Sequence, residues 1–248
     1  MKSRFLLVVV LAACLYIPVQ AQKADGTPEG YTRIFNGVDL TGWRGRPGNG
    51  GVFSPYVEAR FTTEERAAAQ KEWNDDRDRH WSVVDGVLVS DGQGVHLATE
   101  RPYADFELLV EYRFTGPNGD SGIYLRSYPQ VQLWDVDNAA QNRHGNSKGS
   151  GGLWNNNDDN PGKWPLVKAD KPTGEWNSLK IKMVDQRVWV ELNGQTTVDG
   201  QILNNFFDRS LPLLPSGSIE LQTHGTETQF RNIFIREIGQ EEAKQIAE

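Results

Sequence analysis

Apolar and polar residues alternate along most of this chain, with a period of two. The clearest case is DFELLVEYRFTG at 105–116, where every second side chain is apolar and the intervening positions are mostly charged. Similar alternation runs through 80–92, 121–136, 175–200, 218–224 and 228–238. A period of two places successive side chains on opposite faces of a strand, so these segments are predicted to be β-strands.

Turn signals separate the predicted strands at steady intervals. Asp85-Gly86 and Asn193-Gly194 are typical of two-residue hairpin turns, and Asp185-Gln186 is a third predicted turn. The segment SGIYLRSYPQVQLWDV is predicted to form two strands around Tyr128-Pro129. Many short strands with regular turns indicate an all-β sandwich or barrel, and the pattern alone leaves both open.

Three segments break this pattern. Residues 62–78 have Thr62 or Thr63 as a cap, acids in the first turn and an alanine-rich centre, which predicts a helix packed on an edge or end of the sandwich. The tail GQEEAKQIAE is predicted to be a short helix. Residues 145–170 form a long predicted loop, and loops of that length are often functional.

One predicted strand carries an unusual row of polar side chains. In GSIELQTHG, Glu220, Gln222 and His224 alternate with Ile219, Leu221 and Thr223 and therefore share one face of the sheet. The ordinary interpretation of such a row is a solvent-facing surface. An acid, an amide and an imidazole in line also suit the wall of a binding pocket, and we favour the pocket.

The first 21 residues have the features of an export signal. A basic start precedes an apolar run that is too short for a membrane span, and Val19-Gln20-Ala21 is a small-residue cleavage site. We therefore expect an exported periplasmic or extracellular protein, with one domain at 22–248. Leu11-Ala12-Ala13-Cys14 also resembles a lipobox, so the alternative is an outer-membrane lipoprotein, which contacts the membrane through a lipid on Cys14.

Composition narrows the choice of ligand. The chain has 248 residues and a formal charge of −7, which argues against nucleic acid and anionic membrane surfaces as partners. Eight tryptophans are consistent with binding a flat neutral ligand such as a sugar, although they also suit a core. The oxygen-rich segments Asp135–Asn138 and Asn155–Asn160 contain ligands that calcium accepts, but neither has the spacing of a known calcium loop, so no cofactor is predicted.

Several segments together resemble the bacterial 3-keto-disaccharide hydrolase domain family. They follow in order from Tyr31 to Ile238: RIFNGVDLTGW, HWSVVDGVLVSDGQGVHLAT, DFELLVEYRFTGPNGDSGIYLR, PQVQLWD, GGLWNN, EWNSLKIKMVDQRVWVELNGQTTVDG and IELQTHGTETQFRNIFIREI. The resemblance implies a concanavalin A-like jelly-roll sandwich of two antiparallel sheets that binds sugar on its concave face. It also implies an exported enzyme that acts on glycosides oxidised at carbon 3. Many relatives have glutamate where this chain has Gln130, which bears on whether the activity and substrate are the same.

A 3-keto sugar changes the catalytic groups that are required. Ordinary glycoside hydrolysis needs two carboxylates beside the scissile bond, and the strand face of Gln130, Gln132 and Trp134 offers none. A ketone at carbon 3 acidifies the proton on carbon 2. A single base can then remove that proton and expel the group on carbon 1, after which water adds back.

Our hypothesis assigns Glu220 as this base and His224 as the acid or the enolate stabiliser. The alternatives without a catalytic role are a solvent-facing strand residue for Glu220 and a turn cap for His224. The remaining candidates are Gln132, Gln222 and Arg126 as hydrogen-bond donors, Gln130 and Asp120 as substrate-binding residues, Trp134 and Trp154 as stacking platforms, and Asp135 as base, metal ligand or turn former.

Two other functions fit the same sequence. A non-catalytic carbohydrate-binding module would share the lectin-like architecture and would bind sugar without turnover. A surface scaffold protein with a vestigial site would have no affinity for sugar.

Overall fold

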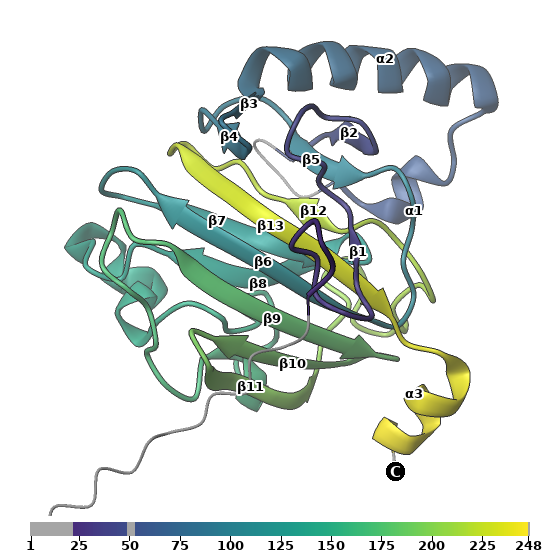
Figure 1. Ribbon diagram of the computed structural model, residues 1–248. Helices are drawn as coiled ribbons and strands as arrows, with labels where there is room; N and C mark the ends of the chain where they lie inside the picture. Colours follow the sequence, from purple (N-terminus) through teal and green to yellow (C-terminus); the bar gives the residue numbers. More distant parts are fainter. Residues whose placement is uncertain (1–21, 49–52, 248) are drawn as a thin grey trace, which may run out of the picture.

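The computed structural model describes residues 22–48 and 53–247, and they form two antiparallel β-sheets (Figure 1). The proposed signal segment and Cys14 lie outside the described residues. In the described part of the chain, no helix combines the length and apolar character needed to cross a membrane. The predicted all-β sandwich of two antiparallel sheets is confirmed.

The larger sheet has eight strands. Its order is β11 (Gln195–Ile202), β10 (Arg187–Leu192), β9 (Asn177–Val184), β6 (Phe106–Phe114), β13 (Thr228–Glu237), β4 (Val87–Ser90) and β3 (Trp81–Val84), with β1 (Thr32–Arg33) paired to β13. The smaller sheet has the order β2 (Trp43–Arg46), β5 (His96–Thr99), β12 (Glu220–Leu221), β7 (Asp120–Leu125) and β8 (Tyr128–Trp134).

The apolar positions of both sheets form one core. In β6 the even-numbered side chains from 106 to 114 are buried and the odd-numbered ones are half-buried, as the alternation predicts. The smaller sheet contributes every second residue to the same core, including Leu97, Ile123, Val131, Leu133 and Leu221. The opposite faces of these five strands therefore point away from the core.

The predicted hairpin turns are confirmed, with one difference. Asp85-Gly86 and Asn193-Gly194 join adjacent antiparallel strands with positive φ at both residues, as a two-residue turn of this kind requires. The turn between β7 and β8 lies at Arg126-Ser127 rather than at Tyr128-Pro129. Proline is tolerated in β8 because this strand is the edge of its sheet.

Helix α2 (Thr63–His80) protects the opposite edge of the same sheet. Thr62 and Glu65 form a capping box at its N-terminus, close to the predicted start. No side chain of α2 is fully buried, so polar contacts attach it. Asn74 accepts from the Gly45 N–H at 2.9 Å, and Gln70 donates to the Gly45 carbonyl at 2.9 Å. These bonds satisfy the exposed backbone of edge strand β2, above which α2 lies in Figure 1.

The remaining helices are short. They are α1 (Pro55–Glu58), the 3-10 helices η1 (Ala139–His144), η2 (Asn146–Lys148) and η3 (Pro161–Lys163), and the C-terminal α3 (Gln240–Ala247). The predicted tail helix is therefore confirmed, and η2 and η3 lie within the predicted long loop.

Candidate functional site

The face of the five-stranded sheet that points away from the core is polar and nearly fully covered. His96 on β5, Glu220 on β12, Tyr124 on β7 and Gln130 and Gln132 on β8 are all at most 4% exposed. Alternation along each strand places them opposite the core residues. The hydrogen bond from the Gln222 N–H to the Gly122 carbonyl, at 2.9 Å, continues the pairing of β12 beyond Leu221. This face is the natural floor for a ligand site.

One half of this face opens into a pocket of about 420 Å³. The walls come from β7, β8, the segment after β12, η1 and the long loop. The lining residues are Asp120, Tyr124, Gln130, Gln132, Trp134, Gln141, Arg143, His144, Trp154, Asn155, Gln222 and His224. The structure thus brings together seven of the candidates chosen from the sequence, with Gln130 and Gln132 of QVQ and Gln222 and His224 of ELQTH facing one cavity.

Asp120 is the carboxylate of this pocket among the lining residues that the structure describes. Its Oδ1 accepts a hydrogen bond of 2.8 Å from Gln132 Nε2, and its Oδ2 lies 3.4 Å from Nδ1 of His224. Burial raises the pKa of Asp120, and the neighbouring His224 and Gln132 offset part of that rise. A carboxylate with a raised pKa beside an imidazole is suited to proton transfer.

Two tryptophans form an aromatic wall. The rings of Trp134 and Trp154 meet edge to face, with centroids 6.0 Å apart and planes at 77°. Trp154 is half-buried, and its Nε1 donates to the carbonyl of His144 at 3.0 Å. That bond fixes the indole on the loop, which leaves an amphipathic surface for a sugar ring.

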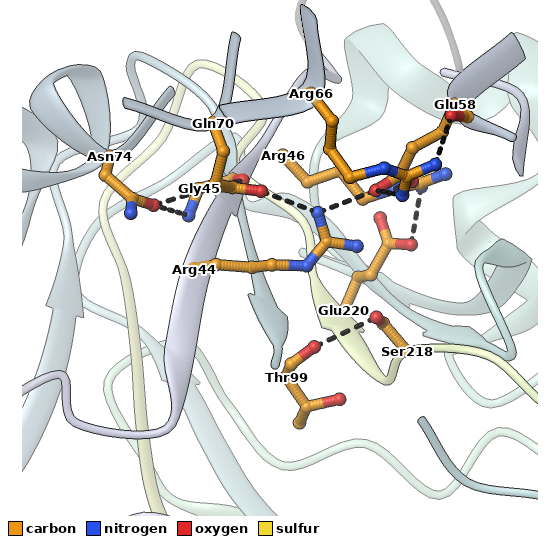
Figure 2. Close-up of polar contacts among 10 residues, drawn as sticks. All are labelled: Arg44, Gly45, Arg46, Glu58, Arg66, Gln70, Asn74, Thr99, Ser218 and Glu220. Atoms are coloured by element: carbon orange, nitrogen blue, oxygen red, sulfur yellow. Dashed lines mark hydrogen bonds and ion pairs between the residues drawn. The ribbon is translucent and has the colours of Figure 1, made fainter. Parts of the chain in front are cut away.

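Glu220 does not line the pocket. It is fully buried beside it, where its Oε1 accepts from Arg46 Nη1 at 2.6 Å (Figure 2). Its Oε2 lies 3.8 Å from His96 Nδ1. Burial alone would raise the pKa of Glu220, but Arg46 and His96 outweigh it and hold the pKa at about 2. A carboxylate held in that state is a weak base.

The ion pair of Glu220 belongs to a larger cluster. Glu58 of α1 accepts from Arg46 Nε at 3.1 Å and contacts Arg44 Nη1 at 2.9 Å (Figure 2). Arg66 of α2 donates to the Glu58 carbonyl at 2.7 Å. These contacts attach both helices to the polar face, so this half of the face is closed.

Arg126 and Asp135 also lie outside the pocket lining. Arg126 donates to the Ala104 carbonyl at 2.7 Å and pairs with Asp105 at 2.6 Å, which secures the turn between β7 and β8. Asp135 accepts from the backbone N–H groups of Asn118 and Asp137 at 2.9 and 3.1 Å. Of the roles open to Asp135 in the sequence, turn formation is the one its contacts match.

In each oxygen-rich segment one asparagine caps a short helix. Asn138 caps η1, and Asn160 caps η3. Over residues 22–48 and 53–247, no group of three or more His, Cys, Asp or Glu side chains is placed to hold a metal ion.

Five pocket residues were not candidates in the sequence. They are Tyr124, Gln141, Arg143, His144 and Asn155. Tyr124 alternates with core residues on its strand, so the period of two could have placed it on the polar face. Arg143 and His144 precede Gly145 and lie outside any periodic segment. The one signal that could have identified them is the presence of two basic side chains next to a long loop.

Comparisons with known proteins agree with this architecture. A family model described as 3-keto-alpha-glucoside-1,2-lyase-like domain matches residues 30–236. The chain is 23% identical to the 3-keto-disaccharide hydrolase of Bacteroides thetaiotaomicron, over 90% of this chain and 81% of that protein.

Two solved structures from Parabacteroides distasonis, both provisionally named as glycosyl hydrolases, are also similar. One is 25% identical with a TM-score of 0.56 and covers 85% of this chain and 95% of its own. The other is 23% identical with a TM-score of 0.57 and covers 91% and 95%. Because the family model spans most of its length, the chain belongs to the family of 3-keto-alpha-glucoside-1,2-lyase-like domains.

Proposed function

We propose that this protein cleaves 3-keto-glucosides in the 420 Å³ pocket, with Asp120 as the base. One observation carries the assignment: Asp120 is the carboxylate on the pocket wall, its pKa is raised, and His224 lies 3.4 Å away. Family membership supports the class of substrate. The position of Glu220 in a closed ion pair supports Asp120 over Glu220 for this role.

The proposed reaction begins at carbon 2 of the oxidised sugar. The carboxylate of Asp120 removes the proton on carbon 2, and the electron pair of the C–H bond forms an enolate with the ketone at carbon 3. The enolate then reforms the ketone, a double bond forms between carbons 1 and 2, and the bond from carbon 1 to the leaving oxygen breaks. His224, in its protonated form, gives a proton to that oxygen.

Hydrolysis requires one further step at the same site. Water adds to the double bond: its hydroxyl bonds to carbon 1, the proton it loses passes to the neutral His224, and Asp120 returns to carbon 2 the proton that it removed. Without this step the net reaction is a lyase reaction. Either outcome uses one carboxylate, which fits a pocket whose described lining does not hold the carboxylate pair of ordinary glycosidases.

The developing enolate needs a positive partner. Arg143 of η1 lies on the pocket wall and donates from Nε to His144 Nε2 at 2.9 Å. A guanidinium aimed at the site of developing charge stabilises the transition state more than the ground state. We therefore assign enolate stabilisation to Arg143, and ring stacking to Trp154.

The test is turnover of 4-nitrophenyl 3-keto-α-glucoside, corrected for spontaneous release in buffer. We expect Asp120→Asn to lower kcat by about 10²- to 10⁴-fold, the usual contribution of a general base. Asp199→Asn, on the exposed surface of β11, is the matched control and should leave kcat unchanged. Near wild-type turnover by Asp120→Asn would remove Asp120 from the mechanism.

The aromatic wall of Trp134 and Trp154 also favours a second candidate, a non-catalytic carbohydrate-binding module. Calorimetry with plain and 3-keto disaccharides separates the two. Binding without any turnover, unchanged in Asp120→Asn, would select the module.

We also propose that the protein is exported, on the strength of the segment 1–21. Mass spectrometry of the mature N-terminus checks this, because cleavage before Gln22 and lipidation of Cys14 give different masses. An unprocessed Met1 in cells would contradict export by either route.

A further inference from the structure

Three glutamines form the floor of the pocket. Gln130 and Gln132 are successive outward residues of β8, and Gln222 approaches from the segment after β12. Gly122 of β7 lies between them, where a Cβ would come within 2.6 Å of Cδ of Gln130. Glycine at this position therefore lets the Gln130 side chain lie flat across β7.

The amide of Gln132 has only one workable orientation. Its Nε2 donates to Asp120 Oδ1 at 2.8 Å, to the Ser121 carbonyl at 3.0 Å and to the Leu133 carbonyl at 3.2 Å. All three partners are acceptors when Asp120 is ionised, because neither a carboxylate nor a carbonyl has a proton to donate. The nitrogen must face them, and Oε1 of Gln132 must face Gln130.

The orientation of Gln132 fixes that of Gln130 in turn. Gln130 Nε2 donates to Gln132 Oε1, so Gln130 Oε1 is on the other side of the amide. That oxygen is buried and has no hydrogen-bond partner among the described residues. Gln222 Oε1 is also buried without a hydrogen-bond partner among the described residues. Gln222 Nε2 lies within hydrogen-bond distance of the Tyr124 hydroxyl, at 3.5 Å.

Unpaired buried acceptors are uncommon in native proteins, since each carries a desolvation penalty of about 1–3 kcal/mol. The terminal torsion of a glutamine is broad, so a small rotation turns its oxygen toward the pocket at little cost. A ligand hydroxyl that donates to such an oxygen removes the penalty. An acceptor oxygen from a ligand gains nothing there.

We propose that Gln130 selects the sugar by accepting a hydrogen bond from one of its hydroxyl groups, and that Gln132 is a positioning residue, because its hydrogen bond to the Asp120 carboxylate fixes the orientation of the Gln130 amide. This rests on the proposed function only in taking a hexose glycoside as the ligand. It assigns to the pocket a preference for hydroxyl donors, which neither the fold nor the family specifies.

Ligands that differ in one hydroxyl test this directly. The probes are methyl α-glucoside, which has no ketone and cannot react by the proposed elimination, and its 2-, 4- and 6-deoxy and deoxyfluoro analogues. NMR titration gives each Kd. Carbon-bound fluorine can act as a weak acceptor and cannot donate. We therefore expect at least one position where both replacements weaken binding by about 3- to 10-fold, the worth of one hydrogen bond.

The variants identify the residue. Gln130→Met is a substitution of similar volume. In this variant, the analogue replaced at the sensitive position should have a Kd within about twofold of that of methyl α-glucoside. Gln132→Met should leave the pocket intact but release the Gln130 amide, so that fluorine and hydroxyl are no longer distinguished. Gln195→Met, on the exposed face of β11, is the matched control and should keep the wild-type pattern.

The outcomes separate the two proposals. Fluoro analogues that bind as well as methyl α-glucoside, an unchanged penalty in Gln130→Met, or no binding of methyl α-glucoside to the wild type would each overturn the inference. The wild-type series needs no variant, so a misfolded Gln130→Met does not remove the test. Absence of 3-keto-glucoside turnover with the ligand pattern present would refute the proposed function and leave the hydroxyl preference standing.

Discussion

Replacement of Glu220 by glutamine should destabilise the fold and leave the chemistry in place. Glu220 and Arg46 are both at 0% side-chain exposure and lie 2.6 Å apart, and Arg46 also holds Glu58 of α1. Glu220→Gln keeps the shape of the side chain and removes its charge. The guanidinium of Arg46 is then left with Glu58 as its remaining charged partner in Figure 2.

The pKa of Glu220 sets the size of the effect. The change from the ordinary value of 4.5 to about 2 corresponds to about 3 kcal/mol of stability. Removal of one member of a buried pair typically costs about 3–5 kcal/mol, which agrees. For a domain of this length, 3 kcal/mol lowers Tm by roughly 6–12 °C.

The direction of the pKa shift determines how the free energy of unfolding changes with pH. Because the folded pKa of Glu220 is lowered, its stabilisation is present above pH 4.5 and is lost as pH falls toward about 2. The free energy of unfolding of the wild type, from urea titrations between pH 3 and pH 7, should therefore fall more steeply in acid than that of Glu220→Gln. A double-mutant cycle with Arg46→Met isolates the pair from other acid-sensitive groups.

Turnover measured on the same proteins completes the test. We expect Glu220→Gln to retain kcat within a few-fold at a temperature where it is folded. A variant that loses less than about 1 kcal/mol but loses turnover would refute the reasoning and make Glu220 the base, as the sequence first suggested.

Three further predictions concern the pocket and the helix that covers the edge of its sheet. Because burial raises the pKa of Asp120 and the base must be ionised, kcat/KM should rise with pH through a midpoint above 3.8, and a pH–rate profile with its acid limb below 3.8 would contradict the assignment. Trp154→Ala should raise KM by about fivefold through lost ring contact, whereas Trp81→Phe in the core should alter Tm instead. Thr62→Ala should lower the free energy of unfolding by about 1 kcal/mol through loss of the α2 cap, and no change in a urea titration would show that this cap is not stabilising.

The fold was largely predictable because its signals are local. Alternation in β6 and the turns at Asp85-Gly86 and Asn193-Gly194 each depend on residues a few positions apart. The turn at Arg126-Ser127 was missed because neither residue is a usual turn former at positive φ, while the nearby Pro129 is a stronger turn signal.

The site was predictable only as a face. A period of two correctly grouped Gln222 and His224 with Gln130 and Gln132, because strands of one sheet present their polar residues on the same face. It grouped Glu220 with them too, and could not show that Glu220 meets Arg46, which is 174 residues away in the chain. Asp120 was predicted only as a substrate-binding residue, because its raised pKa depends on burial within the folded protein that no local pattern reports.

The polar face therefore divides according to the chemistry of its side chains. On β2 and β12 it holds full charges, which are stable out of water only when they are paired, so Arg46 and Glu220 are closed beneath α1 by Glu58. On β7 and β8 it holds the amides of Gln130 and Gln132, for which a missing partner costs far less, and one carboxylate, Asp120, which has Gln132 and His224 as partners within the protein. An open pocket can persist only on that second half. When a ligand dissociates from an amide there, no buried charge is left without a partner. The binding site lies where the sheet can tolerate an empty state.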